Sequence, residues 1–504
     1  MSDPTFGMSI TRKDNEPRPA VGSDLSVVGL VGFAPAASEA AFPLNTPVQI
    51  FSDDAVALAS LGAEGTLPQA ISLVNAQLGE YQAAAKIVIV RCEYNDGDEA
   101  ANLAALVGDA AAKSGLHALL EAGPVLGVVP RLIGVPGYTW QQESGLAALT
   151  LTGIGSNLTE APAITFTGGG NDPGKVLPTA HAVLGEGADA GKVVSVVIDT
   201  PGANLTAAPV VVFSGGGEDE GKTLPTATAE LGVLANVVCA ALPPILEQLV
   251  GHAVVQGPGT SLLAYTNWRE TISSMRLIPL ETGVKVGSPA EVVDGVATVL
   301  GIAVRRDHEK GGKPFHSWAN QPVYGIVGPQ RPLRFSLTDG ATEAQQILSL
   351  NGGVILRGEA GVEGAIAAGG FVYIGTDTAA EDDLWRFYNV SRGRDYIHLL
   401  FLRTLRFYLG RFNITGQAIE AVVNTMKLAL RDLQADGNIL GYTVGFTRDQ
   451  NSPENLRLGK FTVNFAAEEA PVLRQINIDS SRYRPALDML LDQLLAQMDQ
   501  NVAA

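Results

Sequence analysis

One stretch of this sequence has the residue types and spacing of a phosphate-binding loop. Residues 216–223 read GGEDEGKT, a glycine-rich pattern in which backbone N–H groups and a lysine can hold nucleotide phosphates. Such a loop must open a helix, because the helix N-terminus supplies the N–H groups. Here Pro225 follows at once, the next residues alternate like a strand, and Asp219 and Glu220 would repel phosphate. We interpret the stretch as a β-turn.

The other residues that could carry chemistry are scattered. The six histidines show no metal-binding spacing such as HExxH, and no serine lies in a nucleophile elbow. Cys92 and Cys239 stand in apolar runs, which is typical of buried, reduced cysteines. The sequence therefore predicts no catalytic, cofactor-binding or metal-binding residue, no cofactor, and a protein that is not an enzyme.

The overall charge limits the partners. The formal net charge is -18, and a strongly acidic chain is repelled by nucleic acid and by anionic membranes. The N-terminus lacks the apolar core of a signal peptide, and the most apolar stretch, 231–250, is interrupted by Pro243, Pro244 and Glu247. We expect synthesis in the cytoplasm, no nucleic-acid partner and no membrane insertion.

The first residues have a strand pattern. Phe6, Met8 and Ile10 alternate with small or polar residues, and a charged, proline-containing linker follows at 12–19. An isolated strand cannot satisfy its own backbone hydrogen bonds. Either it pairs with a sheet, in this subunit or in another, or the terminus is frayed.

The pattern of strands and helices predicts several domains. Alternating apolar strands and helices, such as the strand 85–92 and the helix 237–249, indicate a mostly parallel sheet covered by helices. We expect a helix from Ser288 to Asp307, because Ser288, Pro289 and Glu291 form a capping signal. This split α/β middle domain comprises residues 23–136 plus 236–369, after an N-terminal arm and linker at 1–22.

Residues 137–235, between the two halves, differ in kind. "NLTEAPAITFTGGGNDPGKVLPTAHAVL" begins at Asn157, and "NLTAAPVVVFSGGGEDEGKTLPTATAEL" begins at Asn204. Each copy reads strand, glycine turn, strand, without a helical period. We expect a small all-β repeat domain inserted at a surface loop.

Residues 370–480 read as α+β. Helices are expected at 396–409 and from Thr415, followed by strands at 439–446, 459–465 and 474–479. The strand residues share an alternating apolar pattern; they are Phe461, Val463, Phe465, Ile476 and Ile478. A C-terminal segment, 481–504, contains an amphipathic helix.

A basic run stands out in this acidic chain. Six arginines occur within a short stretch: Arg386, Arg392, Arg394, Arg403, Arg406 and Arg411. They could pair with the chain's own carboxylates. They could instead form a surface that binds an acidic partner.

From Gly311 onward the chain resembles the tail sheath proteins of contractile bacteriophages. The resemblance rests on "GGKPFHSWANQPVYGIVG", on "ILSLNGGVILR", and on the segment that begins "FVYIGTDTAAEDDLWRFYNVSRGRDY". Where the family usually has Trp-Gly-x-Arg-Thr, this chain has Tyr373, Ile374, Gly375 and Thr376, whereas the Asn-x-x-Arg element is present at Asn389 and Arg392.

The resemblance implies a structural subunit that forms stacked six-fold rings around a tail tube and contracts without nucleotide. It implies that 370–480 is the conserved inner sheath domain, completed by N- and C-terminal arms that add strands to neighbouring subunits. Arg392, Arg394, Arg403 and Arg406 become candidates to face the tube. The implied partners are further copies of the chain, the tube protein, and the baseplate and terminator proteins, in a virion assembled in the host cytoplasm.

Three other interpretations remain open. The sheath of a contractile bacteriocin or injection particle would assemble and contract by the same physical mechanism. An α/β enzyme with a carbohydrate-binding β insert would need a polar catalytic cluster, which the sequence does not show. A secreted adhesin would need a signal peptide.

Overall fold

The computed structural model describes residues 25–79, 84–172, 174–358 and 370–502. The chain divides into two compact units, one extending to Ala470 and the other beginning at Pro471. The expected arm strand at Phe6, Met8 and Ile10 lies outside the described residues. No helix within the described ranges is long and apolar enough to cross a membrane.

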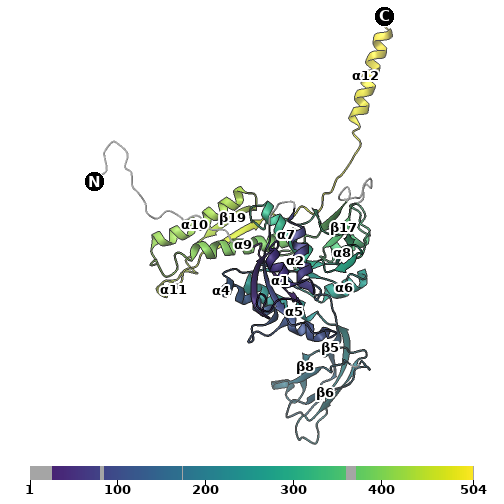
Figure 1. Ribbon diagram of the computed structural model, residues 1–504, viewed down its shortest axis with the longest axis vertical. Coiled ribbons are helices and arrows are strands. Elements are labelled where there is room, and N and C mark those ends of the chain that lie inside the picture. Colours follow the sequence, from purple (N-terminus) through teal and green to yellow (C-terminus); the bar gives the residue numbers. More distant parts are fainter. Residues whose placement is uncertain (1–24, 80–83, 173, 359–369, 503–504) are drawn as a thin grey trace, which may run out of the picture. The chain divides into compact units, whose positions relative to one another are not determined.

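A six-stranded sheet forms the centre of the first unit (Figure 1). Its order is β12-β11-β4-β1-β3-β2, and every neighbouring pair is parallel except β2 with β3. These strands are β1 (Val28–Phe33), β2 (Pro47–Phe51), β3 (Lys86–Cys92), β4 (Leu132–Gly134), β11 (His252–Gln256) and β12 (Leu277–Leu280). The last two follow residues 137–235, so the sheet is built from both sides of that segment. The predicted mostly parallel sheet is confirmed.

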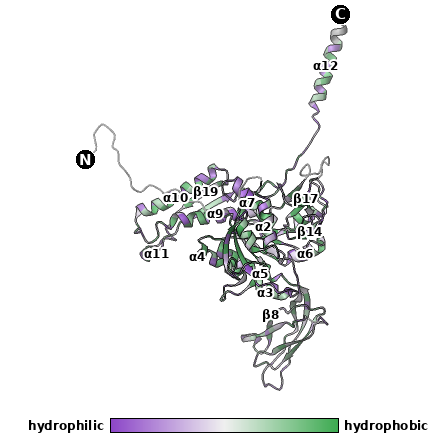
Figure 2. Ribbon diagram, in the orientation of Figure 1, coloured by the Kyte–Doolittle hydropathy of each residue, from purple (hydrophilic) through white to green (hydrophobic). Residues whose placement is uncertain are grey.

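Helices cover both faces of this sheet because its strands are apolar on both sides, as the green strands in Figure 2 show. On one face α2 (Thr66–Ala76) and α7 (Val296–Glu309) pack against Val28 and Leu30. On the other face α3 (Glu99–Val107) and α5 (Val237–Leu249) pack against Val31. The shorter helices around the sheet are α1 (Ala55–Leu61), η2 (Gly115–Glu121), α4 (Ala122–Leu126) and α6 (Leu262–Glu270).

The helix expected from Ser288 to Asp307 begins later than predicted. α7 starts at Val296, and the residues before it form β14 (Glu291–Val293), which pairs with β13 (Val284–Val286). β13 also pairs with β16 (Gly328–Pro329) on its other side. The local hairpin of β13 and β14, which β16 extends from a distant part of the sequence, therefore overrides the capping signal.

Another three-stranded sheet lies beside the one formed by β14, β13 and β16. It precedes the C-terminal part of the unit. It has the order β15-β18-β17, and α8 (Glu343–Ser349) lies between β15 and β17 in the sequence. Its strands are β15 (Gln321–Pro322), β17 (Val354–Arg357) and β18 (Phe371–Ile374). Tyr373 of β18 is buried in the same apolar cluster as α7.

The inserted repeats consist of β-strands and turns, which agrees with the strand pattern of the sequence; we call this part the repeat module. Their strands are β5 (Ser144–Gly153), β6 (Ala163–Gly168), β7 (Thr179–Leu184), β8 (Val193–Thr200), β9 (Pro209–Ser214) and β10 (Thr226–Val233), with the short η3 (Gly187–Asp189). They make a four-stranded sheet, β8-β7-β6-β9, and the pair β10-β5. Ser144 pairs with Val233, so the chain enters and leaves the module at neighbouring positions.

Each repeat caps the glycine turn of the other. The Thr159 N–H donates to the Gly216 carbonyl at 3.1 Å, and the Thr206 N–H donates to the Gly169 carbonyl at the same distance. A Cβ on Gly217 would lie 1.7 Å from the Thr159 hydroxyl oxygen, so only glycine fits there. The two copies therefore form one interlocked structure.

The last part of the first unit is α+β. It comprises α9 (Tyr388–Leu405), α10 (Gly416–Ala435), β19 (Ile439–Gly445), α11 (Pro453–Arg457) and β20 (Asn464–Glu469). β19 and β20 form an antiparallel pair that packs on both long helices. Phe465 lies in β20 as expected, whereas Phe461 and Val463 precede the strand, because ladder pairing begins only at Asn464.

The second unit holds α12 (Pro485–Val502), preceded by residues without helix or strand. Ile476 and Ile478 were expected in a sheet, but within the described residues they belong to no strand and are 70% and 84% exposed. A strand needs a ladder partner, and this segment has none within the described part of its own chain. α12 presents an apolar stripe that is also exposed: Leu487, Leu490, Leu491, Leu494, Leu495 and Met498.

Candidate functional site

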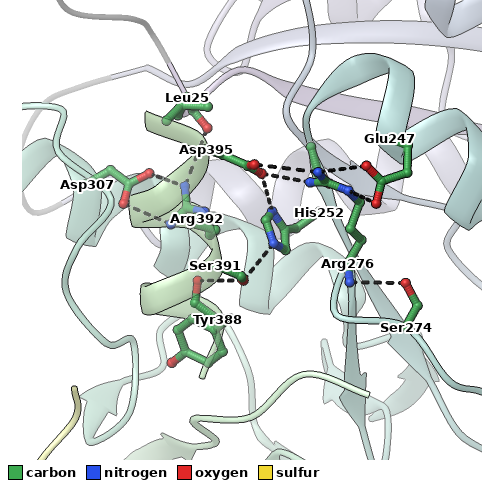
Figure 3. Close-up of polar contacts among 11 residues, drawn as sticks. Leu25, Glu247, His252, Ser274, Arg276, Asp307, Tyr388, Ser391, Arg392 and Asp395 are labelled. Atoms are coloured by element: carbon green, nitrogen blue, oxygen red, sulfur yellow. Dashed lines mark hydrogen bonds and ion pairs between the residues drawn. The ribbon is translucent and has the colours of Figure 1, made fainter. Parts of the chain in front are cut away.

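The first half of α9 carries polar side chains into the interior (Figure 3). Tyr388, Ser391, Arg392 and Asp395 follow the spacing i, i+3, i+4, i+7, which places them on one side of a helix. All four are buried. A buried polar group is costly unless it is paired, so their partners determine how α9 is held.

Arg392 is fixed by a bidentate ion pair. Its Nη2 lies 2.6 Å from Asp307 Oδ2, and its Nη1 lies 3.2 Å from Asp307 Oδ1. Asp307 stands in the last turn of α7, so the pair joins the two helices. The guanidinium also lies over the Trp318 ring, 5.0 Å from its centroid.

A second group of charges links α9 to the central sheet. Arg276, just before β12, donates from Nη1 to Asp395 Oδ2 at 2.7 Å and from Nη2 to Glu247 Oε2 at 3.0 Å. His252 of β11 lies beside the Arg276–Asp395 pair, and its Nε2 is 2.8 Å from the hydroxyl oxygen of Ser391 on α9. Figure 3 shows His252 directed at both Ser391 and Asp395.

Burial sets the protonation states in this group. Desolvation, reinforced by the guanidiniums of Arg276 and Arg392, holds the pKa of His252 well below its usual value. Burial raises the pKa of Asp395, while its hydrogen bond from Arg276 opposes the rise. His252 is therefore neutral at pH 7 and acts as a hydrogen-bonding residue.

Arg394 and Asn389 point from α9 toward the end of β20. Arg394 Nε and Nη2 donate to Glu469 Oε1 and Oε2 at 2.6 and 2.9 Å. Asn389 Nδ2 donates to the Ala470 carbonyl at 3.1 Å. The Glu469 side chain is only 3% exposed, so this pair is largely shielded from water.

The second half of α9 and the residues directly after it, from Arg406 to Phe412, are different. Arg403 and Arg406 are exposed, and the large apolar residues around them are exposed as well: Leu402, Leu409 and Phe412. An exposed patch that combines arginine with large apolar side chains has the composition of a protein-binding surface.

The basic run is thus divided between two roles. Arg392 is 2% exposed and bound to Asp307, so the expectation that it faces a tube is corrected: an interior side chain cannot reach a partner. Arg394 is committed to Glu469. Of the four candidates, Arg403 and Arg406 are at the surface, and their contact with a tube stays a prediction.

The β19–β20 pair offers unfilled strand edges. In the described part of the chain neither strand has a second ladder neighbour, and Leu440 and Phe446 at the ends of β19 are exposed. A two-stranded sheet is marginal by itself and accepts further strands.

The phosphate-loop pattern is a turn, as interpreted from the sequence. The Lys222 ammonium donates to the Gly217 carbonyl, and in the sister copy Lys175 donates to the carbonyls of Gly168 and Gly170. Both lysines thus hydrogen-bond to carbonyl groups of their own glycine turns. β10 follows the loop, where a phosphate site would need a helix.

Two further observations concern chemistry. Among the described residues, no group of three His, Cys, Asp or Glu side chains is placed to hold a metal ion. Cys92 and Cys239 are both buried, and burial raises the pKa of Cys92 to about 12, which keeps its thiol protonated.

The sequence analysis missed the group formed by His252, Arg276 and Asp395. A usable signal was present: His252 and Arg276 each stand directly beside a short apolar run that forms a buried strand. A charged residue at such a position has to find a partner in the interior.

Comparison with known proteins gives relatives of one kind. The tail sheath protein of Escherichia phage P2 is 20% identical over 491 residues, covering 95% of each chain. The tail sheath protein of Burkholderia phage BcepMu is 24% identical over 496 residues, covering 94% of this chain and 96% of the relative. A protein of Pseudomonas aeruginosa described as a prophage major tail sheath protein is 25% identical, but the match spans 47% of this chain and 59% of that protein. No protein-family model matches.

Solved structures agree with the sequence comparison. The sheath complex of an extracellular contractile injection system (PVC), in its contracted state, has a TM-score of 0.57 at 12% identity and covers 96% of this chain and 99% of that one. The contracted helical sheath of the anti-feeding prophage has a TM-score of 0.53 at 14% identity, with the same coverage. Sequence therefore relates this chain to phage tail sheath proteins, and its fold is that of contractile sheath subunits.

Proposed function

We propose that this chain is the subunit of a contractile tail sheath. It polymerises as stacked six-fold rings around a tail tube and contracts to drive the tube through a host envelope during genome delivery. The observation that carries this proposal is the end-to-end sequence relation to the phage P2 tail sheath protein.

The unfilled edges and exposed ends supply the means of polymerisation. β19 and β20 each lack an outer neighbour in the described residues, while Ile476 and Ile478 form an apolar, extended segment without a partner. Strand addition between subunits would satisfy both needs, because main-chain hydrogen bonds join the segment of one copy to the edge of the next. The alternating residues Phe6, Met8 and Ile10 would serve as a second donated strand, and α12 would bury its apolar stripe on a neighbour.

Contraction in this proposal needs no bound nucleotide. The extended polymer is metastable, and the subunits gain contacts when they slide into the contracted arrangement. The arms keep the mesh continuous while the bodies move. Energy is stored at assembly, so the function requires neither a cofactor nor a catalytic group.

The remaining partners follow from this position in a tail. Arg403 and Arg406, with the exposed apolar residues beside them, form the proposed tube-facing surface. The ends of the polymer would meet a baseplate protein and a terminator protein. The assembled protein would belong to the virion, after assembly in the host cytoplasm.

A second candidate is the sheath of an injection particle that carries no genome. It is favoured by the fold, which matches the PVC and anti-feeding prophage sheaths over 96% of this chain. The particle isolated with the native protein separates the two: a DNA-filled capsid supports a phage, and a capsid-free particle supports an injection system.

Negative-stain microscopy of the purified chain tests the proposal. The wild type should form long hollow polymers, alone or with its tube protein, and chains lacking 1–20 or 471–504 should stay as folded subunits. As a control, replacing 144–233 by a short linker should leave the polymers intact, because Ser144 and Val233 are already paired neighbours. Normal polymers from both truncated chains would refute the role of the arms. A wild type that never polymerises would refute the sheath proposal itself.

A further inference from the structure

We infer that the first half of α9 is a mechanical clamp that holds the starting points of both terminal segments. We call these points the roots: Leu25–Ser26 for the N-terminal segment and Glu469–Ala470 for the C-terminal segment. The inference rests on the proposed function only in assuming that the terminal segments connect subunits and so carry tension.

The N-terminal root is held by the Arg392–Asp307 pair. Ser26 Oγ donates to Asp307 Oδ2 at 3.0 Å, and Arg392 Nη2 donates to the Leu25 carbonyl at 3.4 Å. Leu25 is itself buried among residues of α9 and α10. Figure 3 shows Leu25 and Asp307 meeting at the guanidinium. The root is thus fixed two residues before β1 begins.

The C-terminal root is held by the next residues of the same helix. Arg394 grips the Glu469 carboxylate with two nitrogens and also donates from Nη2 to the Ala467 carbonyl at 2.6 Å. Asn389 binds the Ala470 carbonyl at 3.1 Å. Both sets of hydrogen bonds lie at the point where β20 ends.

The two grips lie close together along one rigid element. Asn389, Arg392 and Arg394 fall within six consecutive residues of α9, which span about 8 Å at the rise of an α-helix. Tension that enters through one terminal segment can leave through the other across this short piece of helix. The six-stranded sheet then lies outside the direct path of the load.

The strands next to the roots show why such a clamp matters. β1 lies in the interior of the central sheet, between β4 and β3. β20 has only β19 as a strand partner within the described residues. Without the clamp, tension on the terminal segments would act directly on these two strands. With the clamp, buried, charge-assisted hydrogen bonds resist the tension before it reaches these two strands.

Single-molecule pulling between the two roots tests the inference on the monomer. Handles are attached through cysteines introduced by Ser23→Cys and Leu473→Cys, since Cys92 and Cys239 are buried. Relative to the wild type with the same handles, Arg394→Gln should lower the mean force of the first rupture. Arg392→Lys keeps the buried positive charge but loses the two-pronged contact with Asp307, and should lower this force as well.

Arg331→Gln is the matched control. It removes a partly buried guanidinium from Glu281 and Glu343 in the same unit, away from both roots. Its first-rupture force should equal that of the wild type, even if its resistance to urea falls. Circular dichroism before pulling confirms that each variant is folded, and if Arg392→Lys misfolds, the comparison of Arg394→Gln with Arg331→Gln decides.

Equal forces for Arg394→Gln and Arg331→Gln, whether both reduced or both unchanged, would overturn the clamp. The measurement needs no polymer. A chain that fails to polymerise but shows the expected difference in force would therefore refute the proposed function and leave the clamp standing.

Discussion

The two halves of α9, the second taken with Arg406 directly after it, carry one kind of charged residue, yet their arginines do different things. Arg392 and Arg394 are bound to Asp307 and Glu469, whereas Arg403 and Arg406 are exposed beside Leu402 and Leu409. The first half is held against α7 and the central sheet by the buried ion pairs of Arg392 and Asp395. The apolar side chains of the second half pack in the cluster formed with α10.

This contrast shows that a cluster of like charges in a sequence is not a single surface. Interior arginines fix the position of an element, because breaking a buried pair leaves an uncompensated charge. Exposed arginines add little to stability.

The largest effect is expected in the first half. Asp307→Ala leaves Arg392 charged and unpaired in the interior, which should lower the free energy of unfolding by about 3–5 kcal/mol. Urea denaturation followed by circular dichroism measures it. Asp383→Ala is the control, because Asp383 pairs with Arg386 at a site where its side chain is 95% exposed. Equal losses for the two variants would remove the distinction between interior and surface pairs.

An intermediate effect is expected from pH. The folded-state pKa of His252 lies below its unfolded value, so below about pH 6.5 the unfolded state binds an extra proton. On acidification, the free energy of unfolding of the wild type should fall by up to about 1.4 kcal/mol per pH unit relative to that of His252→Gln.

Urea denaturation of both proteins between pH 7 and pH 5 measures this difference in slope. Burial raises the pKa of Asp294 to about 6. That carboxyl contributes the opposite slope, but it is present in both proteins and cancels in the comparison. Parallel pH profiles would show that His252 is not held neutral in the folded state.

The smallest effect on folding is expected in the second half. Arg403→Ala combined with Arg406→Ala should change the free energy of unfolding by only about 0.5 kcal/mol or less. The same variant should still polymerise but should no longer assemble around the tube protein. Co-sedimentation with preformed tubes measures this, and Lys427→Ala on α10 serves as a surface control. Undiminished binding to tubes would place the tube contact elsewhere.

The local sequence pattern predicted helices and strands well where burial and secondary-structure propensity agree. The helix at Val237–Leu249 has the expected bounds, and the strand at Lys86–Cys92 begins one residue later than expected. Both are apolar segments with clear ends, and Asn236 caps the helix through its side chain. The two repeats were recognisable as β-structure because their glycine turns and alternation are preserved in both copies.

The predictions that failed concern residues whose partners are distant in sequence. The capping signal at Ser288 gave way to the hairpin of β13 and β14, in which β13 also pairs with β16, a strand distant in sequence. Arg392 and Arg394 find their carboxylates on α7 and at the end of β20, which no local spacing encodes. Ile476 and Ile478 have a strand pattern, but a strand forms only when an edge is supplied.

The adjacent ends of the repeat module have a practical consequence. Because Ser144 and Val233 face each other across one ladder, the segment between them can be exchanged for any foreign domain whose own termini meet. Such a graft would be carried once by every copy of the chain. The junction thus offers a natural mounting point for displaying cargo at high density along an engineered particle.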